Sequence, residues 1–251
     1  MASLFSLAGQ TALVTGASRG LGQAIAVALA EAGAKVICAS SSSEGSRDTV
    51  AKITAAGGQA LVLAADLSDE AAVEQLAAQA LAQGPVDILV NCGGTIFRAP
   101  AHQFPMKEWH KVIAVNLDSA FLLSQRLGAE MIKRKSGKII NIASMLSYSG
   151  GITVPAYTAS KHAIAGLTKA LANEWAQHNI QVNAIAPGYF RTDNTAALQA
   201  DTERNAAITA RIPAARWGEP EDLAGAAVFL ASGASDYVNG HVLAVDGGWL
   251  A

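Results

Sequence analysis

Residues 15–22 read Thr15-Gly16-Ala17-Ser18-Arg19-Gly20-Leu21-Gly22 and join a short apolar run, residues 11–15, to a segment of helical periodicity, residues 23–31. Glycine at positions 16, 20 and 22 lets the backbone turn sharply and approach a bound group closely, because glycine has no Cβ. The free N–H groups at the start of the following helix suit a phosphate. We therefore predict that this turn binds phosphate, although its spacing is G-x-x-x-G-x-G and not the dinucleotide fingerprint G-x-G-x-x-G.

The rest of the chain alternates β-branched runs with longer segments rich in Ala and Leu. Runs typical of strands cover residues 11–15, 35–39, 60–64, 86–91, 138–142, 181–185 and 242–245. Segments typical of helices cover residues 23–31, 71–82, 106–134, 155–177 and 221–231. Most strand runs are apolar without alternation, as in a parallel sheet covered on both faces. The pattern predicts an α/β fold, namely a single Rossmann-type domain over residues 1–251 with a doubly wound, seven-stranded parallel sheet and helices on both faces.

The composition fits one large core and excludes several classes of function. Of 251 residues, 51% are hydrophobic and 15% are charged, so the chain can bury most of its surface in a single core. The net charge is −2 and the 18 Lys and Arg residues are dispersed, so we expect no nucleic-acid partner. Residues 1–9 lack a basic segment followed by an apolar stretch, and no window holds about 18 consecutive apolar residues. We expect a soluble, cytoplasmic protein with no membrane partner.

The cysteines and histidines form no recognisable site in the sequence. Cys38 and Cys92 fall at the ends of strands predicted to flank the first strand on opposite sides, about 10 Å apart and beyond the roughly 7 Å limit for a disulfide. We expect two buried, reduced thiols. No histidine stands at metal-ligand spacing from another histidine or from a cysteine, so we predict no metal site.

Tyr157 and Lys161 stand four residues apart inside the predicted helix 155–177, so their side chains project from one face. An ammonium group one helical turn from a phenol favours phenolate and lowers the pKa of the phenol below its usual value of about 10. Ser144 follows an apolar strand, where its hydroxyl can hydrogen-bond a reacting oxygen. The three side chains together predict carbonyl or alcohol redox chemistry, although a Tyr and a Lys at this spacing also occur by chance on many helices.

Further motifs occur in a fixed order along the chain. They are residues 15–22, Asn91-Cys92-Gly93-Gly94, Asn116, Ser144, Tyr157, Lys161 and Pro187-Gly188. Together these motifs resemble those of the short-chain dehydrogenase/reductase family, and the resemblance covers essentially the whole chain. It implies an NAD(P)-dependent oxidoreductase that transfers a hydride to or from a carbonyl or hydroxyl carbon and needs no metal.

The resemblance implies four catalytic residues. Tyr157 is the expected acid/base, and Lys161 is expected to lower its pKa and to hold the nicotinamide ribose. Ser144 is expected to anchor the substrate oxygen. Asn116 matches the residue that holds a water in a relay from Lys161 to solvent, although a polar residue that kinks a helix is a second explanation.

The same resemblance assigns the contacts to NAD(P)(H). They are Gly16, Ser18, Arg19, Gly20, Leu21, Gly22, Ser40, Ser41, Asp66, Leu67, Asn91, Gly93, Tyr157, Lys161, Pro187, Gly188 and Thr192. Asp66 matches the residue that accepts a hydrogen bond from the adenine amino group, although capping the N-terminus of a helix is an alternative role. Pro187, Gly188 and Thr192 are expected beside the nicotinamide carboxamide.

Two departures from the family pattern bear on these expectations. The stretch Asn91-Cys92-Gly93-Gly94 stands where the family has Asn-Asn-Ala-Gly, so we expect an intact but slightly looser strand end. Ser40 stands where NAD-preferring members place an acidic residue, and three more serines follow it. Nothing there repels a 2′-phosphate, and Arg19 in the glycine turn is expected to contact one. We therefore favour NADP(H) over NAD(H).

Within the family, residues 139–147, 172–176, 211–218 and 245–250 resemble members that act on keto-deoxygluconate, deoxygluconate and uronate-type sugar acids. The expected substrate is therefore a small sugar acid. Its expected contacts are Arg98, Ser144, Tyr157, Arg191 and Asn194. A guanidinium suits a carboxylate, although solvation at the surface is an alternative for each arginine. Trp175 and Trp217 are expected to pack in the core.

Two other functions remain open at this point. A 3-oxoacyl or general carbonyl reductase would have the same fold and could be separated by its substrate. A nonenzymatic dinucleotide sensor is the more distant alternative, but such a protein has no need for Ser144, Tyr157 and Lys161 together.

The chain also carries apolar surface in excess of what one subunit needs. The segments 106–134 and 155–177 keep more apolar residues than one sheet face can cover, and the chain ends in Trp249, Leu250 and Ala251. Such surface is commonly buried between subunits. With the family resemblance, the expected assembly is a homotetramer.

Overall fold

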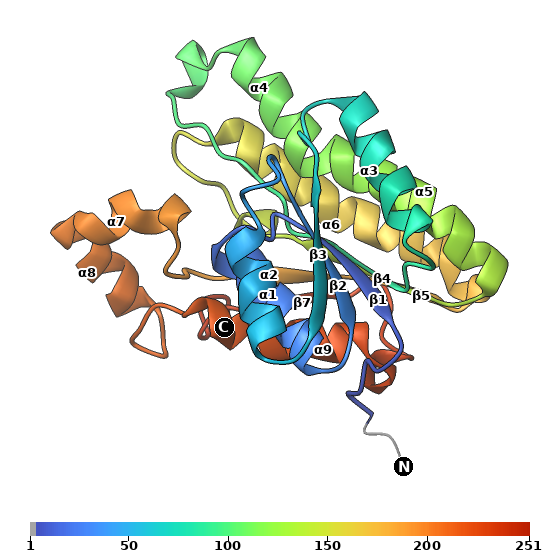
Figure 1. Cartoon of the computed structure of the whole chain (residues 1–251). Coiled ribbons are helices and arrows are strands. Elements are labelled where there is room, and N and C mark those ends of the chain that lie inside the picture. The colour runs from blue at the N-terminus through green and yellow to red at the C-terminus, as the bar shows by residue number, and fades with distance from the viewer. Residues whose placement is uncertain (1–3) are drawn as a thin grey trace.

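The fold is built on a parallel sheet whose strands run in the order β3-β2-β1-β4-β5-β6-β7 (Figure 1). The computed structural model describes residues 4–251, so residues 1–3 of the N-terminal segment 1–9 lie outside the described part. The strands are β1 (Thr11–Thr15), β2 (Lys35–Ser40), β3 (Gln59–Ala64), β4 (Ile88–Asn91), β5 (Gly137–Ile142), β6 (Ile180–Pro187) and β7 (Val242–Val245). The chain runs outward from β1 to β3 and then crosses back to β4 beside β1. The predicted doubly wound sheet of seven parallel strands is confirmed within residues 4–251.

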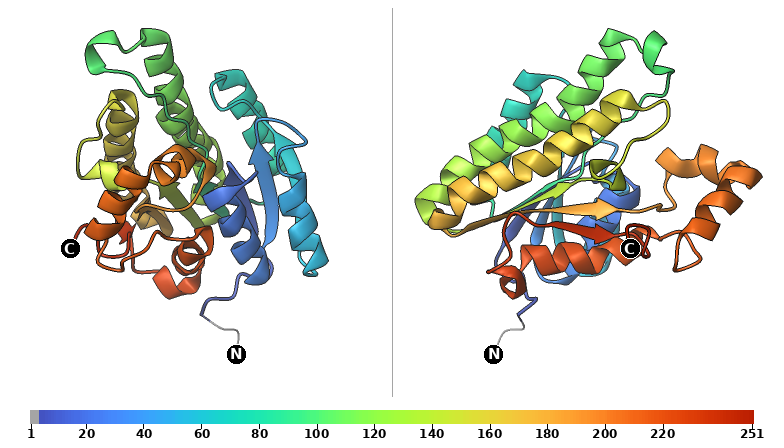
Figure 2. Two further views of the ribbon diagram at one scale, coloured as in Figure 1. Left: turned by 90° about the vertical axis from the view of Figure 1, so that its left-hand side faces the viewer. Right: turned by 180° about the vertical axis from the view of Figure 1, so that it is seen from behind.

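Helices cover both faces of this sheet (Figure 2). They are α1 (Gly20–Glu31), α2 (Arg47–Ala55), α3 (Glu70–Ala82), α4 (Met106–Ile113), α5 (Ser119–Arg134), α6 (Pro155–Trp175), α7 (Ala196–Ala200), α8 (Thr202–Arg211) and α9 (Ala224–Ala231). On one face α1 packs against α2 and α9. On the other face α3, α5 and α6 pack on the sheet, whereas α7 and α8 project from its body.

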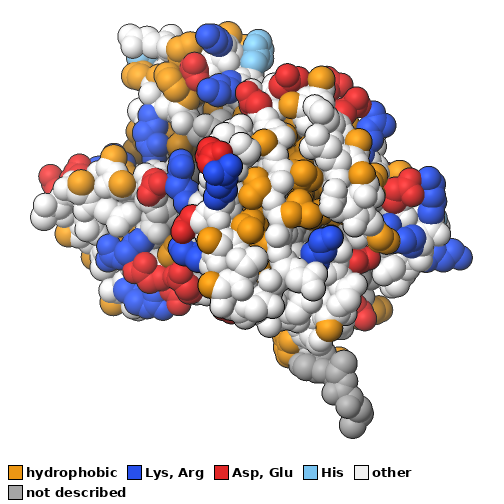
Figure 3. Space-filling view, viewed as in Figure 1, with side chains coloured by type: hydrophobic (Ala, Val, Ile, Leu, Met, Phe, Trp, Pro, Cys, Tyr) orange, Lys and Arg blue, Asp and Glu red, His pale blue; other side chains and the backbone are white. Residues whose placement is uncertain are grey.

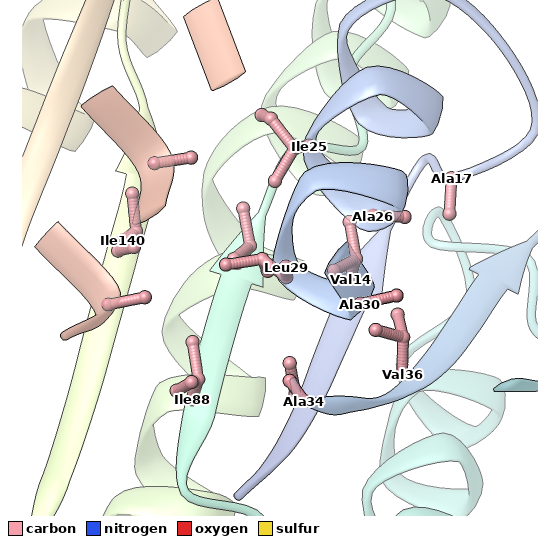
Figure 4. Packing of buried hydrophobic residues seen from close by; sticks show 14 of the residues in the cluster. Val14, Ala17, Ile25, Ala26, Leu29, Ala30, Ala34, Val36, Ile88 and Ile140 are labelled. Atoms are coloured by element: carbon pink, nitrogen blue, oxygen red, sulfur yellow. The ribbon is translucent and has the colours of Figure 1, made fainter. Parts of the chain in front are cut away.

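Alternate residues of β1 enter different halves of the core. Val14 packs with Ile25 and Leu29 of α1 (Figure 4), whereas Leu13 packs on the opposite face with Leu127 of α5. This follows from the two-residue period of a strand, which sends neighbouring side chains to opposite faces. Because both faces are covered, both sets must be apolar, and this is why the central strands carry continuous apolar runs.

The helices differ from the sequence-based expectation in two respects. The segment 106–134 is not one helix, because a π-helical turn, Ala114–Asp118, separates α4 from α5. In addition, α2, α7 and α8 were not expected. Their residues are mostly polar or exposed, and Ile208 is the buried residue of α8, so no apolar stripe marks these helices in the sequence.

The surface carries charges of both signs. Figure 3 shows Lys and Arg side chains interspersed with Asp and Glu on the face that it displays, without a continuous basic patch. Within residues 4–251, no helix is both long and apolar enough to cross a membrane.

Candidate active site

The glycine loop, residues 15–22, packs so closely against the loop after β4 that side chains have no room. A Cβ on Gly16 would lie 2.9 Å from the Cα of Gly93, and a Cβ on Gly22 would lie 2.1 Å from the carbonyl oxygen of Gly16. Gly16 also has a φ of +66°, a left-handed conformation that glycine adopts at low cost. The loop therefore presents bare backbone and the N–H groups of the first turn of α1, as phosphate binding requires.

Two clefts meet at the glycine loop and share Gly16, Ser18, Gly94 and Thr95. One cleft has a volume of about 210 Å³ and is called the catalytic cleft below, because the expected catalytic residues Tyr157 and Lys161 border it. The far cleft lies over the ends of β2 and β3 and has a volume of about 440 Å³. An extended ligand whose middle crosses the glycine loop reaches both clefts, and a dinucleotide has this shape.

Most cofactor residues expected from the sequence border one of the two clefts. These are Gly16, Ser18, Arg19, Gly20, Leu21, Gly22, Ser40, Ser41, Asp66, Leu67, Gly93, Tyr157, Lys161 and Thr192. Asn91, Pro187 and Gly188 border neither cleft. Pro187 is paired with Val245 in the sheet, and the N–H of Gly188 donates to the Val245 carbonyl oxygen at 2.9 Å. Both residues therefore belong to the β6–β7 pairing.

Asp66 borders the far cleft and does not cap a helix. Its Oδ1 accepts hydrogen bonds from the backbone N–H of Ser68 at 2.9 Å and from the Ser68 hydroxyl at 2.7 Å, and these bonds lower the pKa of Asp66. The N-cap of α3 is Asp69, whose Oδ1 accepts the N–H of Ala71 at 2.9 Å. The N-cap alternative for Asp66 is therefore wrong, and its carboxylate faces the cleft.

Lys111 of α4 also borders the far cleft, and sequence reasoning missed it. Its charge contributes to the lowered pKa of Asp66. A single lysine on an amphipathic helix carries no signal of such a position. Lys111 and Val115 stand four residues apart and both border the far cleft, so this helical spacing is the signal that could have placed Lys111 there.

Arg19 does not border the far cleft, although it follows Ser18, which borders both clefts, and its expected contact with a 2′-phosphate stays a prediction. Arg19 borders the catalytic cleft, where its Nε lies 2.8 Å from Oδ2 of Asp193. Asp193 belongs to the segment that leads into α7, so this contact joins the glycine loop to the base of the projecting helices. Sequence reasoning did not consider Asp193, because the ion pair joins residues far apart in the chain.

Ser144 and Tyr157 lie close together although they come from different elements, and of the two Tyr157 borders the catalytic cleft. Ser144 follows β5, and Tyr157 stands in the first turn of α6, which begins at Pro155. Hydrogen bonding from Ser144 is one of the influences that lower the pKa of Tyr157, so the two side chains act on each other. Burial raises the pKa of Tyr157, and the Ser144 hydrogen bond and the charge of Arg98 oppose this shift only in part. The phenol therefore keeps its proton at neutral pH and is suited to act as an acid.

Lys161 does not produce the expected lowering of the Tyr157 pKa. Its Nζ donates to the carbonyl oxygen of Ile142 at 2.5 Å and lies 5.6 Å from the centroid of the Tyr157 ring. The ammonium is thus bound to the end of β5, and desolvation of the phenol outweighs the effects that favour phenolate. Burial also lowers the pKa of Lys161, to about 8.

Asn116 lies in the π-helical turn and is 3% exposed. Its Oδ1 accepts the N–H of Thr95 at 2.8 Å, and its Nδ2 donates to the Thr95 carbonyl oxygen at 3.0 Å and to the Ser160 hydroxyl at 3.1 Å. Asn116 therefore fixes a loop that borders both clefts against α6, beside Lys161. The irregular helix and the position next to the site occur together, as is frequent for π-helical turns.

The altered strand end Asn91-Cys92-Gly93-Gly94 is tethered, and the expected loosening is not seen. Thr15 Oγ1 accepts the N–H of Cys92 at 3.1 Å and the N–H of Gly93 at 3.0 Å. The Nδ2 of Asn91 donates to Asn141 Oδ1 at 2.9 Å, so this side chain turns into the core and not toward the cofactor. Its Oδ1 is buried without a partner.

Both cysteines are free thiols, Cys38 on β2 and Cys92 directly after β4, and these strands flank β1 on opposite sides; the expected burial is confirmed for Cys38 and is wrong for Cys92. Cys38 is buried, whereas Cys92 is partly exposed and borders the catalytic cleft. Burial raises the pKa of Cys38 to about 12 and that of Cys92 to about 11. Both therefore remain protonated and poorly reactive at neutral pH.

The candidate substrate contacts differ in whether they already form an ion pair with another residue of the protein. Arg98 forms no ion pair within residues 4–251, and its charge acts on Tyr157. Arg191 is paired with Glu219, with 3.1 Å between Nε and Oε1. Asn194 borders the catalytic cleft. Of the two candidate arginines, Arg98 is therefore the one without an ion-pair partner within residues 4–251, although neither Arg98 nor Arg191 borders either cleft.

The other arginines and the tryptophans have structural partners. Arg216 is paired with Asp222 at 2.6 Å, and the guanidinium of Arg211 lies 3.9 Å from the centroid of the Trp249 ring. Trp175 and Trp217 are 7% and 1% exposed, so their expected packing role is confirmed. Among residues 4–251, no three His, Cys, Asp or Glu side chains lie close enough together to hold a metal ion.

A family model described as Enoyl-(Acyl carrier protein) reductase matches residues 16–250 of this chain. The chain belongs to the short-chain dehydrogenase/reductase family. Within this family, it is 56% identical to a protein of Bacillus subtilis (strain 168) named 2-dehydro-3-deoxy-D-gluconate 5-dehydrogenase, over 98% of this chain and 97% of that protein. The family resemblance inferred from the motifs is confirmed.

Solved structures of this family are also closely similar. One is described as an NAD(P)-dependent gluconate 5-dehydrogenase of Beutenbergia cavernae with bound NADP at low occupancy. It shares 53% identity and a TM-score of 0.96, and the match covers 99% of each chain. Another is a gluconate 5-dehydrogenase of Burkholderia cenocepacia J2315 in complex with NADP and tartrate, with 41% identity and a TM-score of 0.94 over 98% of this chain and 97% of that chain.

Proposed function

We propose that this enzyme transfers a hydride between NAD(P)(H) and a keto or hydroxy group of a small sugar acid of the 2-keto-3-deoxygluconate, deoxygluconate or uronate type. The observation that carries the proposal is that Tyr157 and Lys161 border the catalytic cleft while Ser144 and the charge of Arg98 act on the Tyr157 phenol. The names of the related enzymes support the sugar-acid class, and the NADP in the related crystal structures supports the cofactor.

The residues of the two clefts fit a dinucleotide. The glycine loop leaves no room for a Cβ at Gly22 and presents backbone N–H groups, which suits the phosphates. Asp66 keeps an ionised carboxylate at the far cleft, where it would accept a hydrogen bond from the adenine amino group. Tyr157, Lys161 and Thr192 border the catalytic cleft at the nicotinamide end. The cofactor, when bound there, supplies or accepts the hydride.

The protein side of the reaction is proton transfer at Tyr157. In the reducing direction the Tyr157 hydroxyl gives its proton to the substrate oxygen, and its raised pKa keeps that proton in place until then. The Ser144 hydroxyl hydrogen-bonds to the same oxygen. We assign the return of the proton from solvent to Lys161, with a pKa of about 8, and to Asn116. In the oxidising direction Tyr157 takes the proton.

The cofactor preference gives the first prediction. NADPH is expected to have a higher kcat/KM than NADH, and Ser40→Asp is expected to reverse this preference. The introduced carboxylate repels a 2′-phosphate and accepts hydrogen bonds from ribose hydroxyls. The measurement is steady-state kinetics with both cofactors. Ser43→Asp is the matched control, because it adds the same charge to the same loop but Ser43 does not border the far cleft.

The substrate carboxylate gives the second prediction. Replacing this carboxylate by a neutral group is expected to cost on the order of 2 kcal/mol in transition-state binding, the scale of a charged hydrogen bond. Arg98→Met is expected to cost a similar amount with the acid and much less with the neutral analogue. The values come from kcat/KM of both enzymes with both substrates.

Arg191→Met is the matched control for this substitution, because Arg191 already has Glu219 as its partner. It is expected to change kcat/KM by less than about threefold. Equal kcat/KM for the acid and its neutral analogue in the unmodified enzyme would exclude recognition of a carboxylate.

A 3-oxoacyl or general carbonyl reductase is the second candidate, and the similarity of this chain, at 36% identity, to a solved 3-oxoacyl (acyl-carrier-protein) reductase of Agrobacterium tumefaciens favours it. A screen of sugar acids and acyl thioesters with NADH and NADPH separates the two. Turnover of acyl thioesters with no turnover of sugar acids would overturn the proposed function.

The proposed assembly is a homotetramer, and it gives the third prediction. Met106 on α4 and Phe121 on α5 are 59% and 44% exposed, and Leu250 near the C-terminus is 39% exposed, so these apolar side chains suit burial between subunits. Light scattering at micromolar concentration is expected to give four times the 25.7 kDa chain mass, and a monomer mass would refute the assembly. We place the enzyme in the cytoplasm, where thiols such as Cys38 and Cys92 stay reduced.

A further inference from the structure

We propose that Asp193 sets the preference between NADPH and NADH by holding Arg19 away from the 2′-phosphate. This inference rests on the proposed function, since it concerns the cofactor of the proposed reaction. It starts from the ion pair between Arg19 Nε and Asp193 Oδ2 at 2.8 Å. Neither residue is needed for the proton transfer at Tyr157.

The glycine loop places Arg19 between the two clefts. Arg19 stands between Ser18, which borders both clefts, and Gly20, which borders the catalytic cleft alone. A 2′-phosphate belongs near Ser40 and Ser41 at the end of β2, in the far cleft. Arg19 borders only the catalytic cleft, because Asp193 holds its guanidinium on that side.

Nothing else fixes the two partners to each other. The side chains of Arg19 and Asp193 are 70% and 74% exposed, and an ion pair so accessible to solvent adds little stability. No further ion pair or side-chain hydrogen bond holds either side chain within residues 4–251. The guanidinium can therefore exchange one anion for another when a stronger one is present.

The two possible anions differ in charge and shape. A phosphate monoester carries about −1.5 to −2 charges at neutral pH and offers three acceptor oxygens, whereas a carboxylate carries one charge. Arginine binds phosphate through two parallel hydrogen bonds. NADPH can therefore draw Arg19 from Asp193, but part of the binding energy is lost in breaking the ion pair. NADH has no 2′-phosphate and leaves the pair intact, so Asp193 weakens NADPH binding selectively.

The glycine loop lies close to the segment that carries Asp193. A Cβ added to Gly20 would come within 3.4 Å of Thr192 Cγ2. Arg19 and Asp193 are thus neighbours without any movement of the loop, and exchange of Arg19 between anions needs rotation of its long side chain.

The test is fluorescence titration of NADPH and NADH into the unmodified enzyme, Asp193→Asn, Arg19→Ala and the double variant. Asp193→Asn is expected to raise the ratio of NADPH affinity to NADH affinity by about 3- to 5-fold, the size of one exposed ion pair. In the Arg19→Ala background, the same substitution is expected to leave the ratio unchanged. Glu130→Gln is the control for net charge, because Glu130 forms an exposed ion pair with Lys133 on α5.

The outcomes separate this inference from the proposed function. An unchanged ratio in Asp193→Asn, an equal gain for both cofactors, or a gain that persists without Arg19 would overturn the role of Asp193 alone. Failure of the unmodified enzyme to bind either cofactor would overturn the proposed function as well. Because the titration needs no substrate, its result does not depend on which sugar acid is turned over.

Discussion

Tyr157→Phe lowers kcat for sugar-acid reduction by about 10² or more, because it removes the hydroxyl that gives its proton to the substrate oxygen. The raised pKa of this phenol means that the proton is present throughout the neutral pH range, so the loss is the same at pH 6 and pH 8. The measurement is steady-state kinetics with saturating NADPH, accompanied by a fluorescence titration of NADPH. The cofactor affinity is expected to persist, since the ring remains.

Tyr237→Phe is the control for this substitution, because Tyr237 is a fully exposed tyrosine that borders neither cleft. It makes the same chemical change and is expected to leave kcat unaltered. A Tyr157→Phe enzyme whose kcat is within about threefold of the unmodified enzyme would show that another group is the acid.

Gly22→Ala weakens NADPH binding by about 100-fold or more. The added Cβ would lie 2.1 Å from the Gly16 carbonyl oxygen and 2.7 Å from the Gly16 carbonyl carbon, which are backbone atoms of the loop itself. The loop must move to admit it, and this misplaces the N–H groups that hold the phosphates. Loss of two charged hydrogen bonds, each worth about 1.5–3 kcal/mol, accounts for an effect of this size.

The matched control is Gly225→Ala, another glycine-to-alanine change near the start of a helix. No atom lies within 4 Å of a Cβ on Gly225, and its φ lies outside the left-handed region. This variant is expected to bind NADPH normally and to be more stable by roughly 0.5–1 kcal/mol, because alanine favours the helix. NADPH titration and thermal unfolding of both variants test the pair, and normal NADPH affinity in a folded Gly22→Ala enzyme would exclude phosphate binding at the loop.

The parts of the fold that could be predicted are those with a local signal. The central strands are apolar on both faces, and the glycine loop follows β1 at once, so residues 11–31 could be interpreted without any tertiary information. The helices α2, α7 and α8 had no such signal, because little of their surface is buried. The π-helical turn at Asn116 was hidden within one long helical pattern, because it interrupts the hydrogen bonding and not the composition.

In the candidate site, too, the features with a local sequence signal could be predicted and the others could not. The residue types and their order identified Ser144, Tyr157 and Lys161, but the expected lowering of the Tyr157 pKa was wrong. A spacing of four residues on a helix predicts that Tyr157 and Lys161 are near each other. The pKa of the phenol, however, depends on its burial and on the direction in which the ammonium group points. The Nζ of Lys161 points to the Ile142 carbonyl oxygen, and the phenol is desolvated.

The sequence by itself determined the fold class, the family and the residues that carry the chemistry, because strand periodicity, glycine spacing and motif order are properties of neighbouring residues. Only the tertiary structure decided which charges are engaged. Arg19 is paired with Asp193 and Arg191 with Glu219, while Arg98 acts on Tyr157. Arg19 and Asp193 are separated by most of the chain. Electrostatic interactions depend on distance in space and on solvent exposure, and neither quantity can be obtained from the order of the residues alone.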